Sequence, residues 1–254
     1  MPLVTLTTDF GTRDSYVAQM KAELLRRGPV DIRLLDLSHE LPPQDIEAAA
    51  FFLRYGVDRF PAGSIHLAVI DPGVGGARRA LALRAGEQLL VGPDNGIFGW
   101  LRAAVTEVVE LDPVRLDLEA ITPTFHGRDL FAPAAAALAQ GRALLEIGSP
   151  TAAIEPRWSE PSLEGGVVRG EVVHVDRFGN LISNIPRTLL ADRAVVAVQL
   201  AEHALAAPCH TYADADEGAP LCLLGSEDLL EVAVRNGSAA AHFALGTGAP
   251  ITVR

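Results

Sequence analysis

Strand-length apolar runs alternate with helix-like segments along the amino-terminal part of the chain. The runs rich in apolar and β-branched side chains span residues 3–8, 32–37 and 64–70. Between them, residues 15–27 carry Val17, Met20 and Leu24 at helical spacing, and residues 44–55 form an alanine-rich segment after two prolines. This alternation predicts an α/β domain with a mostly parallel sheet covered by helices on both faces.

The pattern changes after residue 148. Before it, we expect a hairpin-like pair at residues 80–85 and 88–91, a short helix at 97–104 and an alanine-rich helix at 130–140. Residues 149–166 are rich in proline, end in two glycines and lack apolar periodicity, which favours a linker. Short strand-like runs follow at residues 167–175, 194–200, 221–224, 229–234 and 250–253. We therefore predict an α/β domain over residues 1–155 and a smaller carboxyl-terminal β-barrel domain over residues 167–254.

Composition narrows the function classes. The chain has 254 residues, of which 49% are hydrophobic, so one or two substantial cores can form. Its formal net charge of −11 argues against nucleic acid as a partner. No apolar stretch approaches the roughly 20 residues of a membrane span, and no secretory signal is visible, so we expect a cytoplasmic protein. The 2 cysteines lack C-x-x-C spacing and predict no zinc site.

Polar clusters follow several of the predicted strands. Residues 70–79, I-D-P-G-V-G-G-A-R-R, place Asp71 and Arg78 on a glycine-rich turn. Similar clusters are T-D-F-G around Asp9, P-D-N-G at residues 93–96, T-F-H-G-R-D around His126 and D-R-F-G-N at residues 176–180. Each has a structural explanation as a turn, a helix cap or a salt bridge. Because they lie at the ends of strands or the starts of helices, together they indicate a shared site.

These motifs, with D-x-F-G-N-x-x-x-N-I and R-N-G-S-A-A, resemble in order the S-adenosyl-L-methionine hydroxide adenosyltransferase family, which is related to the SAM-dependent fluorinase and chlorinase. The resemblance implies an α/β domain, a β-barrel domain, and a homotrimer with active sites between subunits. It also implies hydrolysis of S-adenosyl-L-methionine to adenosine and methionine by attack of water at C5′, without a metal or other cofactor. The catalytic residues it implies are Asp71, Arg78 and His126.

The resemblance also implies substrate contacts. Asp9 corresponds to the carboxylate that binds the ribose hydroxyls, and Asp14 and Asp176 to positions that hold the methionine ammonium. Asn180 corresponds to the residue that recognises the adenine edge, and Phe178 could stack on that base. The remaining positions are Ser226 for the methionine carboxylate, Asn236 and Ser238 beside adenine, and Asp94 and Asn95 near the ribose or behind the catalytic residues. Glu227 and Asp228 depart from the family pattern, because two acids beside Ser226 would repel a carboxylate.

Three alternatives remain open. The halogenating relatives carry an aromatic hydroxyl in place of Asp71, and the fluorinase has a serine in place of Gly127, so the sequence favours hydrolysis over halogenation. A metal-dependent hydrolase could use Asp9, His39, Asp71 and His126, although a histidine in the place of His39 is more often a core or turn residue. The chain could also be a module that binds S-adenosyl-L-methionine or adenosine without turnover.

Overall fold

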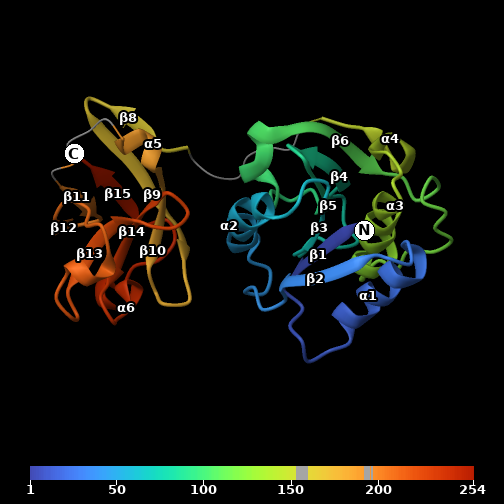
Figure 1. Cartoon of the computed structure of the whole chain (residues 1–254), viewed down its shortest axis with the longest axis horizontal. Coiled ribbons are helices and arrows are strands. Elements are labelled where there is room, and N and C mark those ends of the chain that lie inside the picture. Colours follow the sequence, from blue (N-terminus) through green and yellow to red (C-terminus); the bar gives the residue numbers. More distant parts are fainter. Residues whose placement is uncertain (153–159, 192–194, 196) are drawn as a thin grey trace. The chain divides into compact units, whose positions relative to one another are not determined.

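A computed structural model describes residues 1–152, 160–191, 195 and 197–254 of the chain. The chain divides into two compact units, Met1–Trp158 and Ser159–Arg254, which are coloured blue to green and yellow to red in Figure 1. In the described residues, no helix is both long and apolar enough to span a bilayer. Residues 153–155 of the predicted first domain and 153–159 of the predicted linker lie outside the described residues.

The first unit is built on a seven-stranded sheet with the order β2-β1-β3-β5-β4-β6-β7. Its strands are β1 (Leu3–Thr8), β2 (Arg33–Ser38), β3 (Ile65–Val69), β4 (Ala80–Ala85), β5 (Gln88–Pro93), β6 (Val105–Leu111) and β7 (Gly148–Pro150). Strands β2, β1, β3 and β5 are parallel, whereas β4, β6 and β7 join antiparallel. The prediction of a mostly parallel sheet is therefore only partly right, because the β4–β5 hairpin reverses the chain and β6 and β7 extend the sheet beyond it.

Helices cover both faces of this sheet, as expected. The helical elements are α1 (Tyr16–Arg27), α2 (Ile46–Gly56), η1 (Val57–Arg59), η2 (Gly99–Ala104), the π-helical turn η3 (Gly127–Phe131), α3 (Ala132–Ala139) and α4 (Leu144–Ile147). Leu67 of β3 packs in one core with Met20 of α1 and with α3. The next residue, Ala68, packs in a second core with Leu53 of α2. Successive residues of one strand are thus buried against opposite helical layers.

The second unit is a nearly closed, antiparallel, barrel-like sheet with the order β12-β11-β15-β9-β10-β14-β13, and β8 pairs with β9. Its strands are β8 (Ser162–Glu164), β9 (Val167–Val175), β10 (Leu181–Pro186), β11 (Val198–Leu200), β12 (His203–Leu205), β13 (Pro220–Leu224), β14 (Leu229–Val234) and β15 (Pro250–Val253); its short helices are α5 (Arg187–Leu190), η4 (Tyr212–Asp214) and α6 (Ala239–Phe243). A bridge between Cys209 and Leu223 brings the chain after β12 beside β13. Of the strand predicted at 194–200, residues 194 and 196 lie outside the described residues.

Candidate active site

A carboxylate, a guanidinium and an imidazole meet just beyond the end of β3. Arg78 Nε donates to Asp71 Oδ1 at 2.9 Å and Oδ2 at 3.1 Å, and Arg78 Nη2 donates to Asp71 Oδ2. The same Nη2 lies 2.8 Å from His126 Nδ1. The side chains of Arg78 and Asp71 are 10% and 4% exposed, so solvent screens this pair weakly. The structure thus brings together the three residues that the sequence marked as catalytic.

Glycine at residue 75 makes this meeting possible. Gly75 has φ +76°, and a Cβ atom there would lie 2.3 Å from the carbonyl oxygen of Pro123. No side chain fits at that distance, so the loop of residues 70–79 packs backbone to backbone against the segment that leads to His126. The same two segments carry Arg78 and His126, which lie in contact although they are 48 positions apart.

Asp94 and Asn95 hold the two ends of the loop formed by residues 70–79. Asn95 Nδ2 donates to the carbonyl oxygen of Ile70 at 2.8 Å, and the backbone N–H of Asp94 donates to the carbonyl oxygen of Arg79 at 3.0 Å. Arg79 Nε returns a bond to Asp94 Oδ2 at 2.8 Å, and Arg79 Nη1 donates to Thr151 Oγ1. Arg79 therefore supports the loop, and Asp94 and Asn95 fix the backbone on which Asp71 and Arg78 stand.

Asp129 organises the segment around His126. Its Oδ2 accepts hydrogen bonds from the backbone and the hydroxyl of Thr122, and its Oδ1 accepts one from Arg128 Nε at 2.6 Å. Burial acts to raise the pKa of Asp129, but the bonds from Arg128 and Thr122 outweigh it and lower the pKa to about 2. His126 stands at the amino-terminal end of the π-helical turn η3, a kind of irregularity that is frequent at functional sites, and its side chain makes no capping hydrogen bond there.

The contact with Arg78 determines the hydrogen positions on His126. A guanidinium carries only donors, so Nδ1 of His126 must accept, and the neutral ring carries its hydrogen on Nε2. Burial and the charge of Arg78 lower the pKa of His126, against the opposing effect of Asp71 and Asp129. At neutral pH the imidazole is therefore uncharged and offers an N–H donor at Nε2.

Asp9 leaves the sheet at the same edge as Asp71. Thr8, at the end of β1, pairs with Val69, at the end of β3. Since β2 and β3 flank β1 on opposite sides, this is the point where the strand order switches, the usual ligand site of such sheets. Asp9 Oδ2 accepts a hydrogen bond from the backbone of Gln44 at 2.7 Å, and Asp14 is exposed between β1 and α1.

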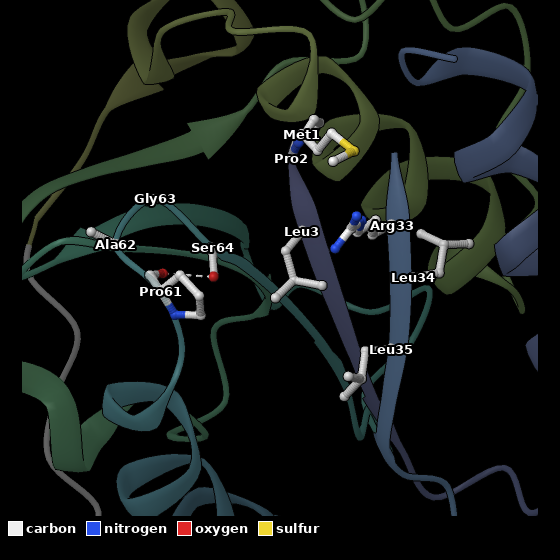
Figure 2. Close-up of a pocket in the computed structure, with 10 residues that line it drawn as sticks. All are labelled: Met1, Pro2, Leu3, Arg33, Leu34, Leu35, Pro61, Ala62, Gly63 and Ser64. Carbon is white, nitrogen blue, oxygen red and sulfur yellow. Dashed lines mark hydrogen bonds between the residues drawn. The ribbon is translucent and has the colours of Figure 1, made fainter. Parts of the chain in front are cut away.

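Two pockets in the first unit differ in their relation to this edge. One, of about 430 Å³, is lined by Phe10 and Phe125, the neighbours of Asp9 and His126 in the chain, and by Tyr16 and Arg128. The other, of about 550 Å³, lies at the amino-terminal ends of β1, β2 and β3 and is lined by Leu3, Arg33 and Ser64, among others (Figure 2). The second pocket is therefore remote from the carboxyl edge that carries Asp9 and Asp71.

In the second unit, residues 176–180 form a self-contained turn. Asp176 Oδ1 accepts bonds from the backbone of Phe178 and Asn180 at 2.8 and 2.9 Å, and Oδ2 accepts one from Asn180 Nδ2 at 2.9 Å. Phe178 is 76% exposed at the tip of the turn. Gly179 has φ +81°, and a Cβ there would lie 2.0 Å from Ser238 Oγ, so the turn abuts the segment that carries Asn236 and Ser238.

The turn between β13 and β14 carries Ser226, which is exposed. Asp228, one of the two acids that raised doubt about a carboxylate site, accepts a hydrogen bond from Arg187 Nε at 2.7 Å, so Arg187 compensates its charge.

A third acid, Glu231, had no signal in the sequence beyond its place in the apolar run L-L-E-V-A-V. Glu231 is 6% exposed and accepts a bond from the Tyr212 hydroxyl at 2.6 Å, and burial raises its pKa.

Metal-ligand geometry and the position of His39 bear on the metal-dependent alternative. Across the ranges that the structure describes, no group of three or more His, Cys, Asp or Glu side chains is arranged to hold a metal ion. His39 is buried and bonded to Thr8 at 2.8 Å, a core position rather than a ligand position.

The comparisons with known proteins cover nearly the whole chain. Residues 4–148 match the model of the SAM hydroxide adenosyltransferase N-terminal domain, and residues 170–252 match that of the C-terminal domain. Two relatives named (R)-S-adenosyl-L-methionine hydrolase are similar: one from Thermus thermophilus at 42% identity, covering 98% of each chain, and one from Salinispora tropica at 40%, covering 94% of this chain and 92% of the relative. A fluorinase from Actinoplanes sp. is 29% identical over 99% of this chain and 97% of its own length.

Solved structures agree. A protein described as an uncharacterized conserved protein from Thermotoga maritima has a TM-score of 0.89 at 31% identity, over 99% of this chain and 100% of that chain. A conserved hypothetical protein from Thermus thermophilus has a TM-score of 0.84 at 37% identity, over 100% of both chains. Family models that span most of both units, with full-length relatives above 30% identity, establish that the chain belongs to the SAM hydroxide adenosyltransferase family.

Proposed function

We propose that this protein hydrolyses S-adenosyl-L-methionine to adenosine and L-methionine, by attack of water at C5′ of the ribose. The observation that carries the proposal is the contact of Arg78 with both Asp71 and His126 at the carboxyl edge of β3. Relatives at 42% and 40% identity, named as hydrolases of this substrate, support the reaction.

In the proposed mechanism, one water molecule bridges Asp71 and His126. It donates a hydrogen bond to Asp71 Oδ1, which accepts one bond from Arg78 and keeps a lone pair. It accepts a hydrogen bond from Nε2–H of His126, and its second lone pair remains for C5′. In this arrangement Asp71 is the base and His126 is a donor that orients the water, since Nδ1 of His126 is already occupied by Arg78.

The leaving group needs no acid. As the oxygen–C5′ bond forms, the C5′–sulfur bond breaks and its electron pair stays on sulfur, which turns a sulfonium into the neutral thioether of methionine. The proton lost by water passes to Asp71 and then to solvent, so one water and one S-adenosyl-L-methionine cation give adenosine, methionine and a proton. The residues therefore act by positioning and by accepting one proton, and the proposal invokes no metal or other cofactor.

Substrate contacts are proposed for residues of both units. Asp9 would accept hydrogen bonds from the ribose hydroxyls, and Asp14 and Asp176 would hold the ammonium. Phe178, Asn180, Asn236 and Ser238 would contact adenine, and Ser226 the methionine carboxylate. We propose that a cytoplasmic homotrimer completes each site with residues of neighbouring subunits. Two findings support these contacts: Asp228 is compensated by Arg187, and Phe178 is exposed.

The reaction is tested by incubating the protein with S-adenosyl-L-methionine in H₂¹⁸O. We expect one ¹⁸O atom in the 5′-hydroxyl of adenosine and none in methionine, and we expect Asp71→Asn to slow formation of this product about 10²–10⁴-fold. The two sulfonium epimers are assayed separately, since the relatives' names specify the (R) form. 5′-Chloroadenosine formed in chloride would point to a halogenase. Binding without adenosine over long incubation would point to a non-catalytic module, and either result would refute the proposal.

A further inference from the structure

His39 connects two loops at the edge of the sheet that carries Asp9. It follows β2 and is 5% exposed. Its ring Nδ1 lies 2.8 Å from the hydroxyl of Thr8, and its carbonyl oxygen accepts a hydrogen bond from the backbone of Gly11 at 2.7 Å. Asp9 lies between Thr8 and Gly11 in the chain. His39, in the loop after β2, therefore holds the turn of Asp9 on both sides.

A chain of contacts leads from Asp36 to the turn of Asp9. Ring Nε2 of His39 lies 3.1 Å from Asp36 Oδ1, a charge contact outside hydrogen-bond geometry, and Asp36 Oδ2 accepts a hydrogen bond from Lys21 at 2.6 Å. A ring hydrogen on Nε2, facing this carboxylate, leaves Nδ1 to accept from the Thr8 hydroxyl. That hydroxyl oxygen then accepts from the backbone N–H of Phe10 at 3.3 Å. The chain ends at the residue next to Asp9.

The same loop also holds the Asp9 carboxylate itself. The backbone N–H of Gln44 donates to Asp9 Oδ2 at 2.7 Å, and Gln44 adopts φ 66° to do so. Among the described residues, no hydrogen bond reaches Oδ1 of Asp9, which leaves this oxygen available to a ligand. A carboxylate held at one oxygen, on a turn held at both ends, is preorganised to accept hydrogen bonds from hydroxyl groups.

We propose that His39 is a positioning residue, which holds Asp9 in the orientation that binds the ribose hydroxyls, acting through the Thr8 hydroxyl and the Gly11 backbone. This inference rests on the proposed function, because it takes the ribose as the ligand of Asp9. Its competitor is a purely structural role, in which the Thr8–His39 pair only stabilises the fold.

The chain contains a matched control for that competitor. Thr5 Oγ1 lies 2.8 Å from His66 Nδ1, and both residues are fully buried. Thr5 stands on the same strand as Thr8, and it pairs in register with His66 in the middle of the sheet, away from the turn of Asp9. Thr8→Val and Thr5→Val therefore each remove one hydroxyl from a buried Thr–His pair and keep the branched shape.

The experiment compares these variants with S-adenosyl-L-methionine and with its 2′,3′-dideoxyribose analogue. We expect both variants to lower Tm by a similar amount, about 2–8 °C. Only Thr8→Val should raise KM for S-adenosyl-L-methionine, about tenfold or more, with kcat within about twofold. The dideoxy analogue lacks both ribose hydroxyls that Asp9 would bind, so Thr8→Val should leave the KM for this analogue unchanged. In an Asp9→Asn background, Thr8→Val should not raise KM further. In the otherwise wild-type protein, Thr8→Ser keeps a hydroxyl and should therefore have the wild-type KM.

An equal rise in KM for both substrates, or an equal rise in both valine variants, would overturn the proposal and leave the structural role. If Thr8→Val does not fold, as judged by circular dichroism, His39→Gln with His66→Gln as its control is read by the same criteria. Failure of the proposed function looks different: the wild-type protein would release no adenosine. Calorimetric Kd values for the two ligands would then test the positioning role in place of KM.

Discussion

Asp71→Asn separates the chemistry at the loop of residues 70–79 from the stability of that loop. Asp71 accepts three contacts from Arg78, all with a side chain that is 10% exposed. An asparagine keeps the shape but has one acceptor oxygen, and its amide hydrogens would face the donors of Arg78. The variant therefore loses the proton acceptor together with part of a buried ion pair.

Both losses can be given a magnitude. Loss of a general base lowers kcat by about 10²–10⁴-fold. The unsatisfied donors of Arg78 cost about 1–3 kcal/mol of unfolding free energy. Because the substrate is held by other groups in the proposal, we expect Kd for S-adenosyl-L-methionine to stay within about threefold of wild type. The measurements are adenosine release by chromatography, Kd by calorimetry, and unfolding in urea.

Arg79→Gln is the matched control for this variant. It breaks the neighbouring ion pair of the same loop, between Arg79 and Asp94, whose side chains are 31% and 16% exposed. We expect a loss of stability of the same order, but a kcat within about tenfold of wild type. Asp71→Asn with kcat within tenfold of wild type would refute the base assignment. Equal losses of kcat in the two variants would mean that any damage to the loop abolishes turnover.

Four further results are expected. Burial and the charge of Arg78 lower the pKa of His126, so kcat/KM should stay level from about pH 8 to 6.5. It should fall only at lower pH, where the ring gains a proton that faces Arg78. A fall in kcat/KM with its midpoint above pH 7 would contradict the role of His126 as an uncharged N–H donor. Gly75→Ala should lower kcat about 100-fold or more, whereas Gly63→Ala, with a similar φ of +79° and no neighbour within 4 Å, should only lower Tm; equal activity in the two would show that the approach to Pro123 is unimportant. Gly127→Ser should produce no halogenated adenosine and should lower Tm, because its Cβ would lie 3.2 Å from Met20 Sδ and 3.3 Å from Phe125 Cε2. Co-expressed Asp71→Asn and Asp176→Ala chains should regain about a quarter of wild-type activity if neighbouring subunits share sites, and none if each subunit works alone.

The sequence predicted the periodic elements and the β4–β5 hairpin well, and the strand directions of the sheet only in part. Helix α1 buries Val17, Met20 and Leu24 as its spacing predicts. Strand β10 was missed as an element because its L-I-S-N-I-P pattern does not alternate. In the structure its polar residues Ser183 and Asn184 are buried with partners from other strands: the Ser183 hydroxyl donates to the carbonyl of Leu230, and Asn184 accepts from the backbone of Glu171. Such partners are tertiary, so no local pattern reveals them.

The site divides in the same way. The motifs placed Asp71, Arg78 and His126 at strand and helix ends, and the fold brings them into contact. Asn95 donates a hydrogen bond to the carbonyl of Ile70, and Gly75 approaches the carbonyl of Pro123 closely. Every residue has a backbone carbonyl, so no side-chain motif reveals these contacts. The hydrogen position on His126 likewise depends on a contact with a residue 48 positions away.

The contacts also give a physical reason for expecting water rather than halide at this site. A bare carboxylate at Asp71 would repel a halide by its charge, but Arg78 compensates that charge at 2.9 Å. What remains is the pairing of one acceptor with one donor: Nε and Nη2 of Arg78 are directed to Asp71 and His126, so an Asp71 oxygen and His126 Nε2–H are the groups that face the nucleophile in the proposed arrangement. A halide accepts hydrogen bonds and cannot donate, so it could use His126 Nε2–H but would meet an oxygen of Asp71 with no hydrogen between them. Water satisfies both groups, and selection for water therefore depends on the pairing of an acceptor with a donor.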